Sequence, residues 1–212
     1  MALRIDTLGV ADSPSAWVDA GFTVGADATC RIGSVGIELL GRERGFGIVG
    51  WSLGGLPPDA GDDVDGIPTA RSDSGAFDAV AHRNGVTAID HVVLMSPDLH
   101  RTVRALSDIG GQPRRERDAT LGDRQIRQIF YRFGDTIVEV VGSPEVSDPG
   151  PSTLWGITFV VADIEESARF FGDHTAAVKP AVQPGRKITT VRHHELGLSV
   201  RTALISARPA RQ

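Results

Sequence analysis

Two acidic residues stand alone inside apolar, strand-like runs of this sequence. Glu139 interrupts TIVEVV, and Glu38 interrupts VGIELL. A carboxylate buried in such a run without a partner is strongly destabilising, so each needs a cation, a metal ion or solvent beside it. Both are therefore candidate metal ligands and candidate general bases. Salt bridges to Arg132 and Arg31 across their hairpins explain the two acids equally well.

Strand alternation is expected to bring His91 to the same face as Glu139. The runs Arg124–Phe133 and Thr136–Val141 predict a hairpin around Gly134-Asp135, with Phe130 opposite Glu139. In AIDHVVLM, His91 should face the same way while its apolar neighbours face the core. The predicted shared face also carries Gln128, Phe130, Arg132, Ile137 and Val141, of which the first three are candidate substrate contacts.

Three arginines near the end of the chain could bind an anionic group. Arg186 follows Pro184-Gly185, a turn that could present it at the rim of a site as a clamp for a carboxylate or phosphate. Pairing of the runs KITTVRHH and LSVRTALI predicts that Arg192 and Arg201 share a face with Ala203. The alternative is a set of solvated arginines. The triplet His193-His194-Glu195 is expected at the surface, at the turn of this hairpin.

A repeated strand–helix–strands pattern positions these residues. Residues 86–142 and 153–206 each show a strand, a capped helix and further strands, and residues 1–55 form a degenerate version. CRIGSVGIELLG aligns with YRFGDTIVEVVG without a gap and superposes Glu38 on Glu139. Residues 56–85, rich in Gly, Asp, Pro and Ser, predict a linker or irregular segment. The fold class expected is α+β, with tandem βαβββ modules in curved mixed sheets and helices outside.

These modules resemble those of the vicinal-oxygen-chelate superfamily, which contains glyoxalases, bleomycin-resistance proteins and extradiol dioxygenases. The resemblance implies that paired modules form an incomplete barrel, or cup, around a small-molecule site. It also implies that His91, Glu139 and Glu38 are ligands of a divalent ion such as Zn, Fe, Mn or Ni. The last module departs from the pattern, with Gly156 and Ala203 at the histidine and glutamate positions.

The function that the resemblance implies is that of a metal-assisted lyase or isomerase, glyoxalase-like, acting on a small oxygenated metabolite. Glu139 or Glu38 would then move the proton. The first alternative is a metal-free binding or sequestering protein of the bleomycin-resistance type. The second is a ring-cleaving dioxygenase, which is less favoured because that chemistry normally needs two histidines and one glutamate.

Bulk composition excludes some partners. A net charge of −5 and a pI of about 5.6 give no electrostatic reason to bind nucleic acid or an anionic membrane. Cys30 is the one cysteine among 212 residues, which excludes an intrachain disulfide and favours a reducing, cytoplasmic compartment. No run is long and apolar enough to span a membrane. A homodimer that completes the cup is a further expectation.

Overall fold

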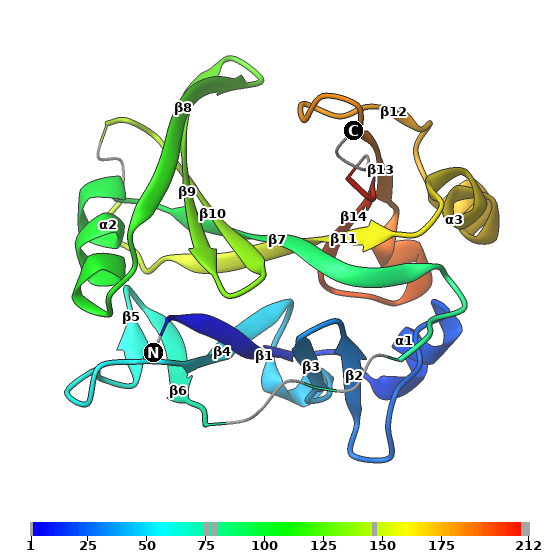
Figure 1. Cartoon of the computed structure of the whole chain (residues 1–212), viewed down its shortest axis with the longest axis horizontal. Coiled ribbons are helices and arrows are strands. Elements are labelled where there is room, and N and C mark those ends of the chain that lie inside the picture. Colours follow the sequence, from blue (N-terminus) through cyan, green and yellow to red (C-terminus); the bar gives the residue numbers. More distant parts are fainter. Residues whose placement is uncertain (1, 74–76, 78–79, 146–147, 209–212) are drawn as a thin grey trace.

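The computed structural model describes residues 2–73, 77, 80–145 and 148–208, and it contains two mixed β-sheets in two layers (Figure 1). The larger sheet is built from residues 86–206. Its strand order is β12 (Lys179–Pro180), β13 (Lys187–Val191), β14 (Arg201–Ser206), β11 (Thr153–Val161), β7 (Val86–Ser96), β10 (Thr136–Gly142), β9 (Arg124–Phe133) and β8 (Pro113–Leu121).

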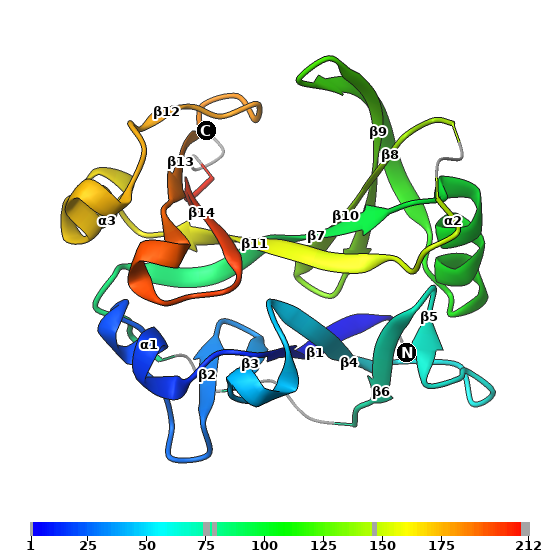
Figure 2. The same ribbon diagram turned by 180° about the vertical axis from the view of Figure 1, so that it is seen from behind.

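Two similar halves meet at the centre of this eight-stranded sheet. β7 and β11 run antiparallel beside each other, while β10 is parallel to β7 and β14 is parallel to β11. Helices α2 (Leu99–Asp108) and α3 (Ile164–Phe171) lie at its two outer sides (Figure 2). Each helix begins where predicted, because Asp98 accepts a hydrogen bond from the Arg101 amide and Asp163 accepts one from the Glu166 amide.

The smaller, six-stranded sheet comes from the first third of the chain. Its order is β2 (Thr29–Ile32), β3 (Val35–Leu39), β1 (Arg4–Val10), β4 (Ile48–Gly54), β6 (Ile67–Arg71) and β5 (Asp63–Val64). β1 and β3 are parallel, and the short helix α1 (Pro14–Asp19) and β2 lie between them in sequence. Three 3₁₀ turns complete the described elements: Arg42–Arg44, Gly172–His174 and His193–Leu196.

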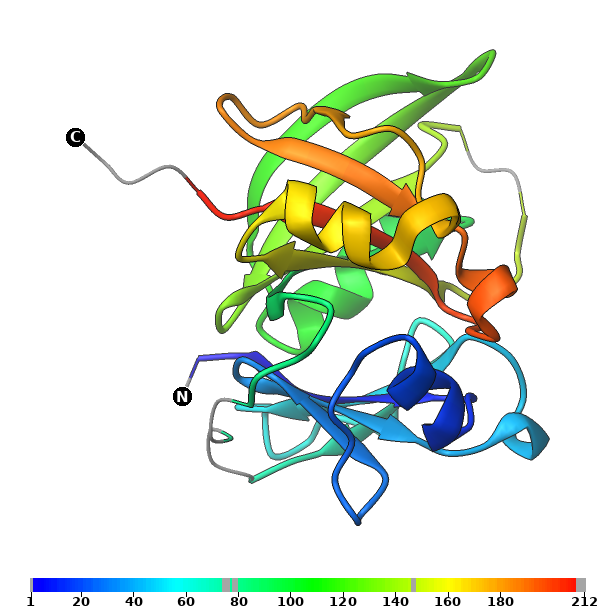
Figure 3. The same cartoon turned by 90° about the vertical axis from the view of Figure 1, so that its right-hand side faces the viewer.

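The hydrophobic core lies between the two sheets (Figure 3). Trp17 and Phe22 of the smaller layer contact Phe159 of β11, with ring centroids 6.4 and 5.4 Å away. Trp51 of β4 lies 6.1 Å from Phe133 of β9. The eight-stranded sheet therefore packs its convex face on the smaller sheet. Its concave face, called the cup below, is not covered by the smaller sheet (Figure 1).

The predicted α+β class, with curved mixed sheets and outer helices, is confirmed. The hairpin register is also as predicted, with Phe130 opposite Glu139 and Arg132 opposite Ile137. Residues 56–85 are less irregular than expected, because residues 63–71 form β5 and β6. β6 pairs in parallel with β4 and antiparallel with β5, and this pairing between distant segments could not be predicted from the local sequence. Within the described part of the chain, no helix is long and apolar enough to cross a membrane.

Candidate functional site

His91 and Glu139 meet in the cup. His91 lies on β7 and Glu139 two residues further along the neighbouring β10, since His91 pairs with Ile137. The Nε2 atom of His91 is 3.4 Å from Oε2 of Glu139, and both side chains are only slightly exposed, at 13% and 12%. The alternating pattern puts Val92 and Val138 on the opposite, fully buried face. The structure thus brings together the two residues that alternation placed on one face.

A β-bulge adds Asp90 to this group. Across β7 and β11, His91 pairs with Thr158 and Ile89 with Phe159, so Asp90 is an extra residue on β7. A bulge re-aims a side chain that would otherwise point to the opposite face. Asp90 therefore turns to His91, with its Oδ2 2.9 Å from Nδ1 of the ring. Sequence alternation alone does not indicate this residue, because it assumes an unbroken ladder.

Arg186 anchors Asp90 from the other half of the sheet. Its Nη1 is 2.5 Å from Asp90 Oδ1, and its Nε donates to the Ser206 carbonyl at 2.7 Å. Burial raises the pKa of the Asp90 carboxyl, but hydrogen bonds from His91 and Arg186 outweigh burial and hold that pKa below its usual range. Arg186 was expected to be presented at a rim; its side chain is instead buried in an ion pair with Asp90, where it lines a pocket of about 310 Å³ together with Ile137.

Arg117 and Gln128 support Glu139 from the opposite side. Nε of Arg117 on β8 donates to Oε1 of Gln128 on β9 at 2.9 Å. Nε2 of Gln128 in turn donates to Oε1 of Glu139. The predicted contact residues Gln128 and Phe130 are half-buried on this face. A row of polar side chains thus crosses the cup from β8 to β7.

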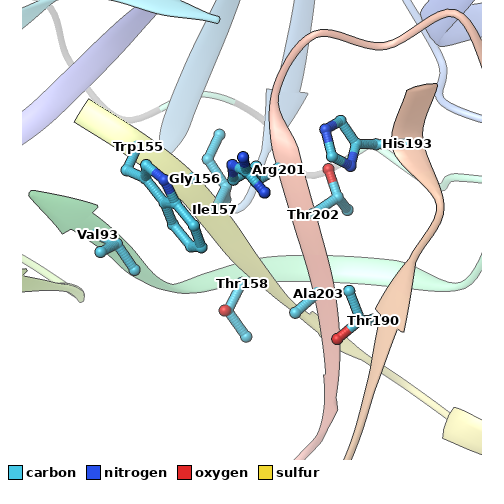
Figure 4. A pocket seen from close by; sticks show the side chains of 10 residues that line it. All are labelled: Val93, Trp155, Gly156, Ile157, Thr158, Thr190, His193, Arg201, Thr202 and Ala203. Atoms are coloured by element: carbon cyan, nitrogen blue, oxygen red, sulfur yellow. The ribbon is translucent and has the colours of Figure 1, made fainter. Parts of the chain in front are cut away.

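An apolar pocket of about 160 Å³ lies beside this row, in the half of the cup formed by β11, β13 and β14 (Figure 4). Trp155 is the extra residue of a second bulge, between Leu154 and Gly156, and it is 46% exposed. The guanidinium carbon of Arg201 lies 4.6 Å from the centre of the Trp155 ring. The lining consists of Val93, Trp155, Gly156, Ile157, Thr158, Thr190, His193, Arg201, Thr202 and Ala203.

His193 lines the same pocket, whereas His194 and Glu195, the other two residues of the triplet predicted at the surface, are exposed. His193 is buried at 7% exposure because the chain leaves the β13–β14 ladder after Val191 and turns through the 3₁₀ helix His193–Leu196. Burial, followed by the charge of neighbouring His194, lowers the pKa of His193. The sequence offered no signal for this burial, since adjacent histidines at a turn resemble a solvated loop.

Arg192 and Arg132, which were also predicted to contact the substrate, do not line the pocket. Arg192 was expected to share the pocket face with Arg201, but it falls outside the ladder, is exposed, and approaches Glu195 at 3.9 Å. Arg132 is also exposed, at the mouth of the β9–β10 hairpin, and its Nη2 is 3.4 Å from Asp135. Arg201 is thus the member of the predicted arginine pair that lines the pocket.

The residues of the cup do not fit the three-ligand metal centre that the resemblance implies. Glu38 lies on β3 of the other sheet, between buried Ile37 and Leu39, so alternation turns it away from the core that separates it from His91. In the second half of the cup, Gly156 and Ala203 take the ligand positions. Among the described residues, no group of three or more His, Cys, Asp or Glu side chains could hold a metal ion.

Close packing of β11 against β14 explains why position 156 carries a glycine and not a ligand. A Cβ at this position would lie 2.7 Å from the Arg201 carbonyl oxygen and 3.0 Å from the Arg201 Cβ. Contacts this short between β11 and β14 exclude any side chain unless the backbone moves. A histidine at the equivalent of position 91 is therefore incompatible with this half of the cup.

Comparison with solved structures shows that other proteins share this fold at TM-scores above 0.5 and low sequence identity. A triple mutant of 4-hydroxymandelate synthase from Streptomyces coelicolor matches with a TM-score of 0.65 and 16% identity, over 100% of this chain and 94% of that chain. A fusion of a xylose isomerase-like TIM barrel with a 4-hydroxyphenylpyruvate dioxygenase matches with a TM-score of 0.58 and 11% identity, over 100% of this chain and 50% of that one. Methylmalonyl-CoA epimerase from Mycobacterium tuberculosis matches with a TM-score of 0.44 and 15% identity, over 59% of this chain and 91% of that one.

No protein-family model matches the chain, and no curated protein matches it. The fold predicted from the sequence is confirmed by the structural similarities.

Proposed function

We propose that this protein binds a small organic molecule in its cup without the help of a metal ion. The observation that carries the proposal is the apolar pocket at Trp155, which adjoins the polar row: Val93 and Thr158 of its lining pair in the sheet with Glu139 and His91. Ligand sites are concave and mostly apolar, with a few polar groups that fix orientation. The residues at the four ligand positions support metal independence. His91 and Glu139 could bind a metal ion, but Gly156 and Ala203 occupy the matching positions in the other half of the cup and have no metal-binding side chain.

The exposed ring of Trp155 indicates the kind of ligand. Its 46% exposure leaves much of a large apolar surface in contact with water, beside a pocket that can shield it. A flat ligand could stack on the ring, a contact that contributes about 0.5–1.5 kcal/mol beyond simple burial. Arg201 lies over the indole and would add charge beside such a ligand. We therefore expect a planar, partly apolar ligand.

Proton transfer on a bound molecule is the second candidate function. Of the three solved structures named above, the two with TM-scores above 0.5 are a synthase and a dioxygenase fusion. In this chain, Glu139 has one oxygen held by Gln128 and the other facing His91, which is a suitable arrangement for a general base in a lyase or isomerase. The ring-cleaving alternative is less favoured, because the described residues offer no group of three or more His, Cys, Asp or Glu side chains for an iron site.

Ligand screening with Trp155→Ala tests the proposed function. Thermal-shift measurements with small aromatic compounds should find ligands whose effect is unchanged by EDTA. Trp155→Ala should weaken their binding about tenfold, the factor expected for losing a stacking contact. Phe46→Ala is the matched control, since Phe46 is 64% exposed and does not line the pocket.

Incubating the protein with the ligands found in this screen distinguishes the binding function from proton transfer. A binding protein returns the ligand unchanged, whereas proton transfer would appear by mass spectrometry as exchange in heavy water or as a product. Ligand shifts that vanish with EDTA, or that survive Trp155→Ala at full strength, would contradict the proposed metal-independent cup.

A further inference from the structure

The polar row across the cup has an arginine at each end, and this fixes the direction of its hydrogen bonds. Arginine only donates hydrogen bonds, because its guanidinium has N–H groups and no acceptor at physiological pH. Arg186 donates at one end to Asp90, and Arg117 donates at the other end to Gln128. Whether each group between the two arginines donates or accepts a hydrogen bond then follows from the group next to it in the row.

From the Arg186 end, the chain determines the tautomer of His91. The carboxylate of Asp90 accepts from Arg186 through Oδ1 and contacts Nδ1 of His91 through Oδ2 at 2.9 Å. An ionised carboxylate only accepts, so Nδ1 must carry the hydrogen. In the neutral ring, Nε2 then presents a lone pair toward Glu139.

From the Arg117 end, the chain orients the Gln128 amide. Its Oε1 must be the atom that accepts from Arg117, so its NH₂ group faces Glu139 and donates to Oε1 of that carboxylate. The other carboxylate oxygen, Oε2, faces His91 and is free to accept a further hydrogen bond.

Two acceptors therefore face each other where the two halves of the row meet. Nε2 of His91 and Oε2 of Glu139 are 3.4 Å apart. That separation is longer than the roughly 2.7–2.9 Å of a charge-assisted hydrogen bond. The longer separation fits a pair of acceptors without a hydrogen between them. Both side chains keep a small exposed surface, while their neighbours Val92 and Val138 on the opposite face are fully buried.

We propose that this acceptor pair recognises a hydrogen-bond donor on the ligand, either a hydroxyl or an ammonium group. The donor would lie against Nε2 of His91 and Oε2 of Glu139 while the apolar body extends toward Trp155. This inference rests on the proposed function, since it names the chemical class of molecule that the cup takes. Asp90, Gln128 and the two arginines act as positioning residues, because they set the polarity of the pair without touching the ligand.

Three probes that differ at one group test the inference: benzyl alcohol, benzylamine and benzyl methyl ether. Each is titrated against the ¹⁵N-labelled full chain in the presence of EDTA, with binding followed by NMR. The alcohol or the amine, or both, should bind about tenfold or more tightly than the ether, which has the same ring but no donor. The comparison of alcohol with amine separates a hydroxyl ligand from a cationic one.

Glu139→Gln is the informative variant. Its side-chain NH₂ group can donate to Nε2 of His91, which closes the gap from within and should abolish the preference for donors. Glu145→Gln, which removes the same charge from an exposed residue, should retain the preference. The ¹⁵N spectrum of the His91 ring provides an independent signature, with the hydrogen expected on Nδ1 in the ligand-free protein at pH 7.5.

Several results would overturn the inference. Equal binding of the ether and the donors, with Trp155 dependence intact, would leave the proposed function standing and remove the acceptor pair. A His91 ring with hydrogens on both nitrogens, or donor binding that requires added Zn²⁺, would also remove it. If none of the three probes binds and the aromatic screen finds no ligand, both the inference and the proposed function are wrong.

Discussion

At the scale of the residue, His82 shows how a buried ring depends on its neutral form. Its Nδ1 accepts a hydrogen bond from the Thr23 amide at 3.0 Å, and its Nε2 donates to the Arg31 carbonyl at 3.0 Å. A protonated ring could not accept from Thr23. Burial lowers the pKa of His82 below its ordinary value of 6.5, which keeps the accepting nitrogen free.

This geometry predicts a loss of stability on acidification. The unfolded chain takes up the proton at a higher pH than folded His82, so the free energy of unfolding falls as the pH drops below about 6.5. His82→Asn should cost about 1–3 kcal/mol at pH 7.5, because one buried partner is lost. It should also lose less further stability between pH 7.5 and 5.5 than the wild type.

Urea unfolding at the two pH values measures both effects. His100→Asn, at an exposed histidine of α2, is the control and should behave like the wild type. An identical acid loss in wild type and His82→Asn would contradict the assignment, and the loss would then belong to another group, such as His193.

At the scale of the element, β11 carries two features that define the pocket. The bulge at Trp155 re-aims the indole, and Gly156 lets β14 approach closely enough for Arg201 to lie over it. The corresponding bulge on β7 re-aims Asp90. The two bulged residues of the site, Asp90 and Trp155, thus both come from the central strands β7 and β11.

Gly156→Ala should disturb this strand pair. The added methyl group would lie 2.7 Å from the Arg201 carbonyl, so we expect a cost of about 1–3 kcal/mol and weaker binding of ligands that contact Trp155. Gly61→Ala is the matched control, since a methyl group there meets nothing within 4 Å. Chemical denaturation of the two variants checks this. A neutral Gly156→Ala would show that β14 can shift without penalty.

At the scale of the whole molecule, Asp65 connects the two layers. It lies in the β5–β6 turn of the smaller sheet, yet its carboxylate accepts hydrogen bonds from Arg101 and Thr102 of α2 and from Ser152 before β11, the last at 2.5 Å. Its side chain is 2% exposed. The segment expected to be a linker therefore supplies a buried anion that joins the smaller sheet to the cup.

Asp65→Asn should weaken this connection. Asparagine tolerates the left-handed backbone at this position, where φ is 53°, so the substitution tests the carboxylate rather than the turn. Weakening the hydrogen bonds that the buried carboxylate accepts from Thr102 and Ser152 should cost about 1–3 kcal/mol. Asp123→Asn, at an exposed turn, is the control. Equal thermal stability of the two variants would show that the layers are held by the apolar core alone.

Much of this architecture was predictable, because local patterns determine local structure. Asp98 and Asp163 fixed the helix starts, and alternation in the hairpin of Glu139 predicted which residues share its face. The resemblance of the modules to vicinal-oxygen-chelate proteins predicted the curved sheet. His91 and Glu139 could be paired from sequence because each lies on an unbroken stretch of ladder.

The remaining features depend on contacts between segments that are distant in sequence. The bulges that expose Trp155 and turn Asp90 arise from the pairing of β7 with β11, some 65 residues apart in the chain, which no local periodicity records. Glu38 shares the motif of Glu139 but lies in the other layer, because the smaller sheet packs on the convex face. The sequence by itself determined the modules and the His91–Glu139 pair. The tertiary structure decided that the neighbouring half of the sheet supplies Trp155 and Arg201 instead of further ligands, since the packing of whole strands determines which residues share the cup.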